Sequence, residues 1–189
     1  MADRYWVGGT ASWDGTAGVK WSTTSGGAGG ASVPTSADDV FFDAASTGTC
    51  TISSGNTGAK SINFTGFTGA LAGTASITVS GSVTLSAVMT LTYTGALRFN
   101  ASGTLTSNGK ALHLLYINGS GITVTLGDDL NVSFYLDIIT GTISAGSYNA
   151  TVANLQSIGT NSRGIQFGTG VWTLTGSNPL NFGTAASES

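Results

Sequence analysis

The sequence predicts an all-β protein, and more narrowly a single-stranded parallel β-helix, or β-solenoid. Apolar and polar residues alternate with a period of two in many short segments, as in strands with one buried face. Nearly every such segment ends at a glycine, which permits a sharp corner. Charged residues make up only 8% of the chain, and Ser, Thr and Asn fill the expected outward positions. Stacked coils favour such residues, because like charges would also stack and repel one another.

The expected strands follow one another from about residue 50 onward. Their inward residues are, in chain order, Ile62/Phe64, Ile77/Val79, Val83/Leu85, Leu91/Tyr93, Leu97/Phe99, Leu112/Leu114, Ile122/Val124/Leu126, Leu130/Val132/Phe134/Leu136/Ile138, Ile165/Phe167, Trp172/Leu174 and Leu180/Phe182. Coils of about 20 to 25 residues would give about six coils. An antiparallel β-sandwich is the alternative, although the Asn-Gly pairs typical of hairpin turns occur only at 108–109 and 118–119.

The chain divides into three parts within one structural domain. Residues 1–49 lack sustained alternation, contain the glycine-rich run SGGAGGAS, and carry Trp6, Trp13 and Trp21. An open end of a solenoid needs a cover, and indoles bury a large apolar area. We therefore predict that these three tryptophans form a structural cap on a solenoid of residues 50–183, which is followed by a polar C-terminal tail, 184–189.

Composition argues against several classes of partner. The net charge is −3, and the cations are dispersed as Arg4, Lys20, Lys60, Arg98, Lys110 and Arg163. The cations therefore form no basic stripe that could bind nucleic acid. No apolar run has the length of a signal peptide or of a membrane span. Cys50 is alone, so no disulfide or thiolate metal site is expected, and its setting predicts a buried strand residue. No cofactor is predicted.

Catalytic candidates are few, and we predict that the protein is not an enzyme. His113 is the only histidine and is expected to point outward from a strand. The acidic candidates form two groups, Asp38/Asp39/Asp43 and Asp128/Asp129. Paired carboxylates serve in glycosidases, and acidic clusters bind calcium.

Neither acidic group has a cation beside it in the sequence. Arg98, Lys110 and Arg163 could meet one of the groups only in three dimensions. Solvated turn carboxylates, with Asp39 or Asp43 accepting backbone N–H bonds, are the simpler interpretation, so no catalytic or metal site is predicted. Among the aromatic residues, Tyr135 is out of phase with Phe134 and Leu136 and is expected to face outward as a surface contact.

Three stretches carry a resemblance to a known group of proteins. They are RYWVGGTASWDGTAGVKWSTTSGGAGGASVPTSADDVFFD, TISSGNTGAKSINFTGFTGALAG and ITVSGSVTLSAVMTLTYTGALRFNASGTLTSNGKAL. Together they resemble Gly/Ser/Thr-rich β-helical virion structural proteins of tailed phages. The tryptophan-rich opening is more loosely similar to the passenger repeats of autotransporter adhesins. The resemblance implies a non-enzymatic structural protein located in the virion, with other capsid or tail proteins as partners.

The sequence leaves the role on the particle open between several alternatives. We expect no helical tail-docking segment in this chain, and this expectation favours a capsid decoration or cement protein. The first alternative is a tail fibre or receptor-binding adhesin in which Trp6, Trp13 or Trp21 stack on host-surface glycans. A polysaccharide-degrading β-helix enzyme is the weaker alternative. A homo-oligomer is compatible with each of these roles.

Overall fold

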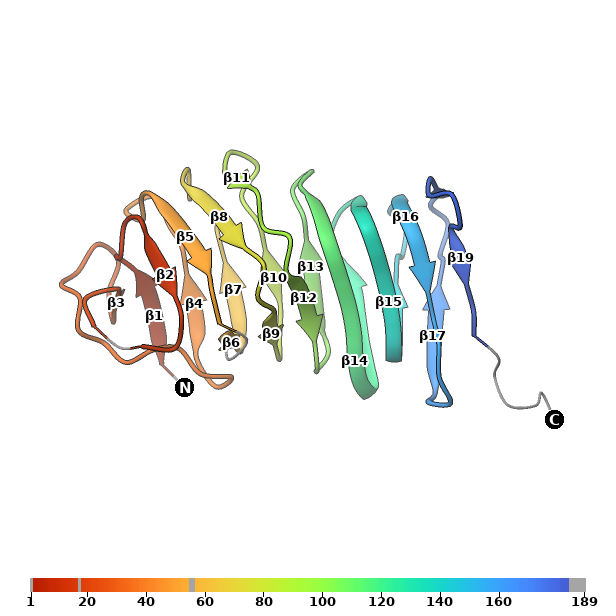
Figure 1. Ribbon diagram of the computed structural model, residues 1–189, viewed down its shortest axis with the longest axis horizontal. Helices are drawn as coiled ribbons and strands as arrows, with labels where there is room; N and C mark the ends of the chain where they lie inside the picture. Colours follow the sequence, from red (N-terminus) through yellow and green to blue (C-terminus); the bar gives the residue numbers. More distant parts are fainter. Residues whose placement is uncertain (1, 17, 55–56, 184–189) are drawn as a thin grey trace.

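The computed structural model describes residues 2–16, 18–54 and 57–183. The chain winds into a β-solenoid of about seven turns, whose rungs lie side by side along one axis (Figure 1). No helix occurs among the described residues, and hence none that could span a membrane. The predicted fold class is confirmed, whereas the predicted tail, 184–189, lies outside the described residues.

Most strands are short, and the longest lie in the second half of the chain. They are β1 Asp3–Trp6, β2 Ala11–Trp13, β3 Trp21–Ser22, β4 Asp39–Phe41, β5 Thr49–Ile52, β6 Thr57–Ala59, β7 Ser61–Asn63, β8 Ala70–Gly73, β9 Ile77–Val79, β10 Val83–Thr84, β11 Thr90–Leu91, β12 Ala96–Phe99, β13 Gly103–Thr106, β14 Ala111–Leu126, β15 Leu130–Ser144, β16 Ala150–Gln156, β17 Arg163–Gln166, β18 Trp172–Leu174 and β19 Leu180–Asn181.

Parallel pairing between successive turns holds the stack together. Along one wall, the paired positions of β4, β7, β10, β13 and β14 lie 22, 21, 22 and 21 residues apart, at Val40, Ile62, Val83, Leu105 and Leu126. A second wall pairs β2, β5, β8 and β11. A third contains β6, β9 and β12. The strand β14 bends around a corner, because it pairs with β12 early in its length and with β13 later.

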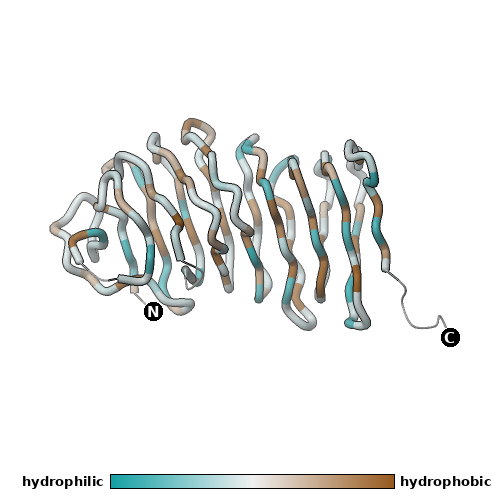
Figure 2. Tube along the Cα trace, in the orientation of Figure 1, coloured by the Kyte–Doolittle hydropathy of each residue, from teal (hydrophilic) through white to brown (hydrophobic). Residues whose placement is uncertain are grey.

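Inward side chains of successive rungs lie on top of one another and form the core. One column consists of Ile77, Leu97, Leu115, Leu136 and Leu155, which are all buried. Apolar and polar segments accordingly alternate along the trace in Figure 2. Cys50 lies in this core as predicted, and burial raises the pKa of its thiol. The alternating pattern therefore identified the inward face of most strands.

The glycines that end strands serve two distinct purposes. Gly66 has a φ of 85°, a backbone conformation that side chains other than glycine disfavour. Gly95 instead lies against the preceding rung, where a Cβ would be 2.2 Å from the carbonyl oxygen of Ala75. Sharp turning and close rung contact both explain why the segments stop at glycine.

The stack begins earlier than the predicted cap boundary. Within residues 1–49, β1 pairs in parallel with β4, and β2 pairs in parallel with β5. Residues 1–49 therefore supply a first rung of the ladder, in addition to residues that cover the end of the core. Among the described strands, only β3 runs against this direction, and it pairs antiparallel with β1 so that Trp6 lies opposite Trp21.

Two inward assignments from strict alternation are wrong at one corner. Leu114 is half-buried and Phe134 is exposed, because the ladder between β14 and β15 has bulges at this corner. A bulge adds a residue to one strand and changes which side chains point outward. Phe134 therefore lies outside the core, beside Tyr135.

We predict that the stability contributed by a leucine of the core column depends on the rung in which it lies. Leu115→Ala, in the middle of the core column, should lower the free energy of unfolding by about 3 kcal/mol, because it leaves a cavity between two packed neighbours. Leu180→Ala in the last rung of the same column should cost less than about 1 kcal/mol, because that side chain is 48% exposed. Urea unfolding of both variants measures the difference, and equal losses would contradict a stack with one open end.

Candidate functional site

The N-terminal end of the solenoid holds a cluster of aromatic rings. Trp21 makes edge-on contacts with Trp6 and Trp13, with ring centroids 5.1 Å and 4.9 Å apart. Phe42 stacks on Trp6 at 5.6 Å and on Phe64 of the next turn at 4.6 Å. The three tryptophans have exposed fractions of 0 to 1%. They lie within the end of the core, covered by the glycine-rich N-terminal segment.

This burial excludes direct sugar stacking by the three indoles. The Trp6 Nε1–H donates to the carbonyl oxygen of Gly9 at 3.2 Å, while the Nε1–H groups of Trp13 and Trp21 are buried without a partner. No ring face is open to a ligand. The alternative in which Trp6, Trp13 or Trp21 stack on glycans is therefore wrong for these residues.

The acidic pair Asp128/Asp129 joins neighbouring turns of the solenoid. The Asp128 carboxylate accepts the backbone N–H groups of Ser107 and Asn108 in the preceding turn. The Asp129 carboxylate accepts the backbone N–H of Asn149 in the following turn at 2.8 Å. Each carboxylate thus accepts hydrogen bonds from backbone N–H groups at a corner. The two aspartates therefore have a structural role, as the simpler interpretation of the sequence expected.

The carboxylates of the second acidic group, Asp38, Asp39 and Asp43, do not form a shared site either. The Asp38 carboxylate accepts N–H bonds from Ala2 and Thr35, and Asp39 pairs with Lys60 at 3.3 Å. Asp43 accepts the N–H of Ala45 at 2.9 Å. Backbone capping thus holds for Asp43, whereas at Asp39 the partner is a lysine. Within residues 2–16, 18–54 and 57–183, no three acidic, histidine or cysteine side chains gather closely enough to hold a metal.

The three cations that could have joined an acidic group are separated. The Arg98 guanidinium lies 4.3 Å from the ring centroid of Tyr116 on the outer wall. Arg163 points into the C-terminal end and donates to the carbonyl oxygens of Gly159 and Asn161. Lys110 follows a turn in which its N–H donates to Ser107. They do not form a shared cationic site beside either acidic group.

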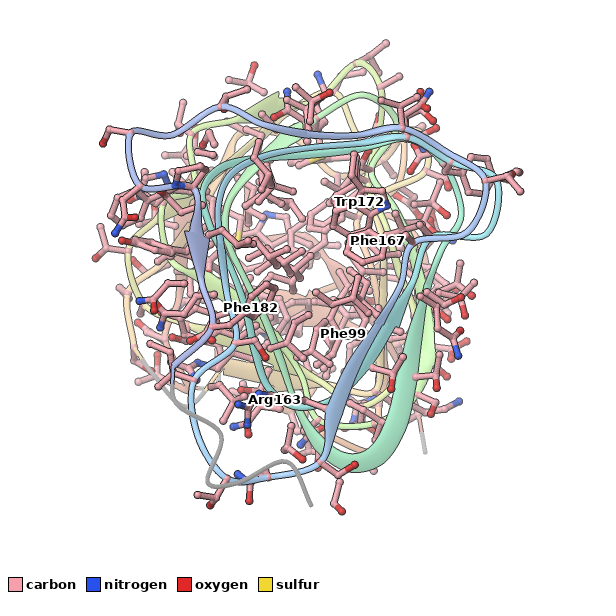
Figure 3. The ribbon with its side chains drawn as sticks, turned by 90° about the vertical axis from the view of Figure 1, so that its right-hand side faces the viewer. Phe99, Arg163, Phe167, Trp172 and Phe182 are labelled. Atoms are coloured by element: carbon pink, nitrogen blue, oxygen red, sulfur yellow. The ribbon has the colours of Figure 1, made fainter. Side chains whose placement is uncertain are left out.

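The C-terminal end of the solenoid is open as far as the described residues, which stop at 183, form it. A hollow of about 660 Å³ is bordered by Ser157, residues 159–165, Phe167, Phe182 and Gly183. Figure 3 looks into this end, where Phe167, Trp172 and Phe182 lie around the interior of the last rung. Phe167 is 49% exposed and Phe182 is 53% exposed. Both were expected to be inward residues, and they are exposed because they lie in the last rung that the described residues form.

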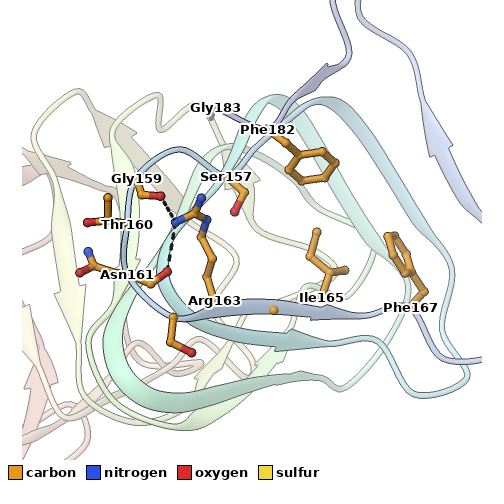
Figure 4. A pocket seen from close by; sticks show the side chains of 11 residues that line it. Ser157, Gly159, Thr160, Asn161, Arg163, Ile165, Phe167, Phe182 and Gly183 are labelled. Carbon is orange, nitrogen blue, oxygen red and sulfur yellow. Dashed lines mark hydrogen bonds between the residues drawn. The ribbon is translucent and has the colours of Figure 1, made fainter. Parts of the chain in front are cut away.

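Strand edges and apolar side chains meet at this end. β17, β18 and β19 each pair only with the preceding turn. Their outer edges therefore carry backbone groups without a strand partner among the described residues. Figure 4 shows Arg163 and the side chains of Ile165, Phe167 and Phe182 around the hollow. An apolar surface with open strand edges is suited to contact with another protein.

A second distinctive surface lies on the outer wall of β12, β14, β15 and β16. We call it the aromatic face and define it by His113, Tyr116, Phe134 and Tyr135 together with Arg98, Asp137, Asn154 and Gln156. Phe134 stacks on His113, with ring centroids 4.9 Å apart and planes 9° apart. It also contacts the half-buried Tyr135 edge-on at 4.5 Å. Tyr135 thus lies in a larger aromatic group, and alternation alone did not identify Phe134 as its neighbour.

A polar column runs beside these rings. Arg98, Tyr116, Asp137 and Gln156 occupy equivalent positions on four successive rungs. The Gln156 Nε2–H donates to Asp137 at 3.4 Å. Burial raises the pKa of Asp137, opposed by the positive charges of Arg98 and Arg163 and by the Gln156 hydrogen bond. Because these residues lie about 20 positions apart in the chain, only the rung register brings them together.

A scan against protein-family models finds no match for this chain. Searches of curated proteins and of solved structures also find no match. Function therefore has to be argued from the residues and geometry described above.

We predict that the aromatic cluster at the N-terminal end carries much of the stability of that end. Trp21→Ala should lower the free energy of unfolding by about 4 kcal/mol, because Trp21 contacts Trp6, Trp13 and Phe42 and is fully buried. Trp172→Ala at the open end is the control and should cost clearly less, because Trp172 is only half-buried. Equal losses in chemical unfolding would contradict a special role for the closed end.

The carboxylate of Asp38 should make stability depend on pH. Burial acts to raise its pKa, but hydrogen bonds from Thr35 and Ala2 outweigh burial, and the net pKa is lowered. Its stabilisation is therefore present above the unfolded pKa of about 3.9 and is lost as the pH falls through the lower folded pKa. Asp38→Ala should cost about 2 kcal/mol at pH 7, and this deficit should shrink toward pH 2. Thermal unfolding between these pH values tests this, and a constant deficit would contradict it.

Proposed function

We propose that this protein is a non-enzymatic structural component of a phage particle, and that it decorates the capsid surface by attaching through its C-terminal end. The resemblance of its Gly/Ser/Thr-rich sequence to tailed-phage virion proteins suggests the setting. The observation that carries the mode of attachment is the difference between the two ends of the solenoid.

The closed end and the open end have opposite properties. Trp6, Trp13 and Trp21 are buried at the first, while large apolar side chains and strand edges are exposed at the last. Burial of Phe167 and Phe182 by a partner would remove apolar area from water and contribute to binding. A rod with one closed end and one adhesive end can cover a particle without polymerising head to tail.

Catalysis is not part of the proposed role. Asp128, Asp129 and Asp43 cap backbone N–H groups, and His113 is stacked on Phe134. General acid–base catalysis needs a pair of groups around a substrate position. Because these side chains already make structural contacts, they favour a mechanical role for the protein.

Particle reconstitution tests the proposal. Particles from a phage strain lacking the gene would be incubated with purified protein, and bound protein would be located with gold-labelled antibody. We expect label over the capsid. Phe182→Ser should reduce binding about tenfold or more, because it removes an apolar contact from the open end. Phe134→Ser, which alters an exposed phenylalanine on the outer wall, is the matched control and should bind normally.

Each other result would contradict part of the proposal. Label on the tail alone would overturn the capsid assignment and favour the fibre alternative. Absence of label on particles would overturn the virion role. Normal binding of Phe182→Ser together with loss in Phe134→Ser would show that the outer wall, rather than the open end, makes the attachment.

A further inference from the structure

We propose that the aromatic face binds an uncharged, extended oligosaccharide of hexose units, which lies along the solenoid axis across the rungs of β14, β15 and β16. The site lies on the outer wall and adjoins the C-terminal end only at Gln156, which pairs with Asn181 of the last described rung. The proposal does not depend on the attachment proposed for that end. These strands lie side by side in Figure 1.

The first argument is the exposure of Phe134. Between the paired inward positions Val132 and Leu136, β15 has three residues, whereas β14 has two between Leu112 and Leu115, and β16 has two between Val152 and Leu155. The added residue produces a bulge that places a phenylalanine in solvent, 43% exposed. A half-exposed ring on a strand surface stabilises the fold only modestly through its neighbouring rings, and bulges commonly direct side chains at binding sites.

The second argument is the arrangement of the rings. His113 and Phe134 are nearly parallel and belong to successive rungs. Tyr135 stands edge-on to Phe134 and adds a hydroxyl group. A sugar ring has an apolar face of C–H groups and an edge of hydroxyls, so an aromatic ring beside hydrogen-bonding groups matches both. Rungs repeat at about 4.8 Å, which is close to the length of one hexose unit in an extended chain.

The third argument is the chemistry of the neighbouring column. Arg98 and Gln156 present planar donors, and the carboxylate of Asp137 accepts hydrogen bonds from hydroxyl groups. The Arg98 guanidinium lies over the ring of Tyr116, with its Cζ 4.3 Å from the ring centroid. Asn154 lies beside Tyr135 in the next rung, where its side-chain N–H donates to the carbonyl of Phe134 at 2.9 Å.

The charge of the aromatic face limits the class of ligand that it can bind. Within the aromatic face, the positive charge of Arg98 and the negative charge of Asp137 lie two rungs apart in one column and offset each other. The charge of Arg163 also acts on Asp137, but its guanidinium is bound to the carbonyl oxygens of Gly159 and Asn161 at the C-terminal end. A polyanion gains little from such a surface, because long-range attraction needs an excess of one sign. Elsewhere the outer walls carry small hydroxyl side chains, as in the column Thr104, Thr125 and Ser144. The aromatic face thus offers stacking and directional hydrogen bonds without net charge.

Binding of defined oligosaccharides to the full chain tests the proposal. Isothermal titration would use maltohexaose, cellohexaose and chitohexaose as neutral probes and oligogalacturonate as the acidic comparison. We expect at least one neutral hexamer to bind. Phe134→Ser should weaken that binding at least tenfold, and Tyr135→Thr several-fold, since each replaces a ring by a hydroxyl side chain found elsewhere on the walls.

Two controls separate binding from folding. Phe182→Ser removes an exposed phenylalanine of comparable accessibility at the open end and should bind the hexamer as the unaltered protein does. The melting temperature of Phe134→Ser should stay within a few degrees of the unaltered protein, because that ring lies outside the core.

The remaining outcomes would overturn the proposal. No heat of binding with any of the three neutral hexamers would do so, as would equal binding in Phe134→Ser. Stronger binding of oligogalacturonate would show that the face selects anions instead. If Phe134→Ser abolished attachment to particles and no sugar bound, the face would be a protein contact.

Discussion

In-register stacking of inward side chains between successive rungs is the constraint on which this structure depends. The walls contribute parallel hydrogen bonds, but the register is set by columns such as Leu97, Leu115 and Leu136, each of which packs on the next. A shift of one residue would turn the whole inward set toward solvent. The near-constant spacing of 21 or 22 residues along one wall is the visible result of this constraint.

A stack of rungs necessarily has two ends, and this protein treats them differently. At the start, a single antiparallel strand brings Trp21 onto Trp6 and completes the core with rings. At the other end, the described chain leaves Phe167 and Phe182 around a hollow. The same apolar columns that stabilise the interior are exposed at the last described rung. The attachment that we propose for that end thus uses a surface that the fold itself creates.

The outer walls are free of the packing constraint, so their composition reflects other demands. Small hydroxyl residues occupy most outward positions of the walls, and they let neighbouring rungs approach without electrostatic repulsion. The aromatic face departs from this composition with a bulge, three stacked or edge-on rings and a balanced pair of charges. Such a departure costs solubility and is expected where a surface has a partner.

The sequence by itself determined the solenoid, because a period of two, corner glycines and scarce charge are local properties that every rung repeats. Inward residues such as Ile62 and Val83, and the buried Cys50, followed from the same pattern. Only the tertiary structure decided that Phe134 faces solvent, since a bulge arises from pairing with neighbouring rungs. It also decided that Arg98, Tyr116, Asp137 and Gln156 share one column, because the register between rungs, and not chain proximity, places them together.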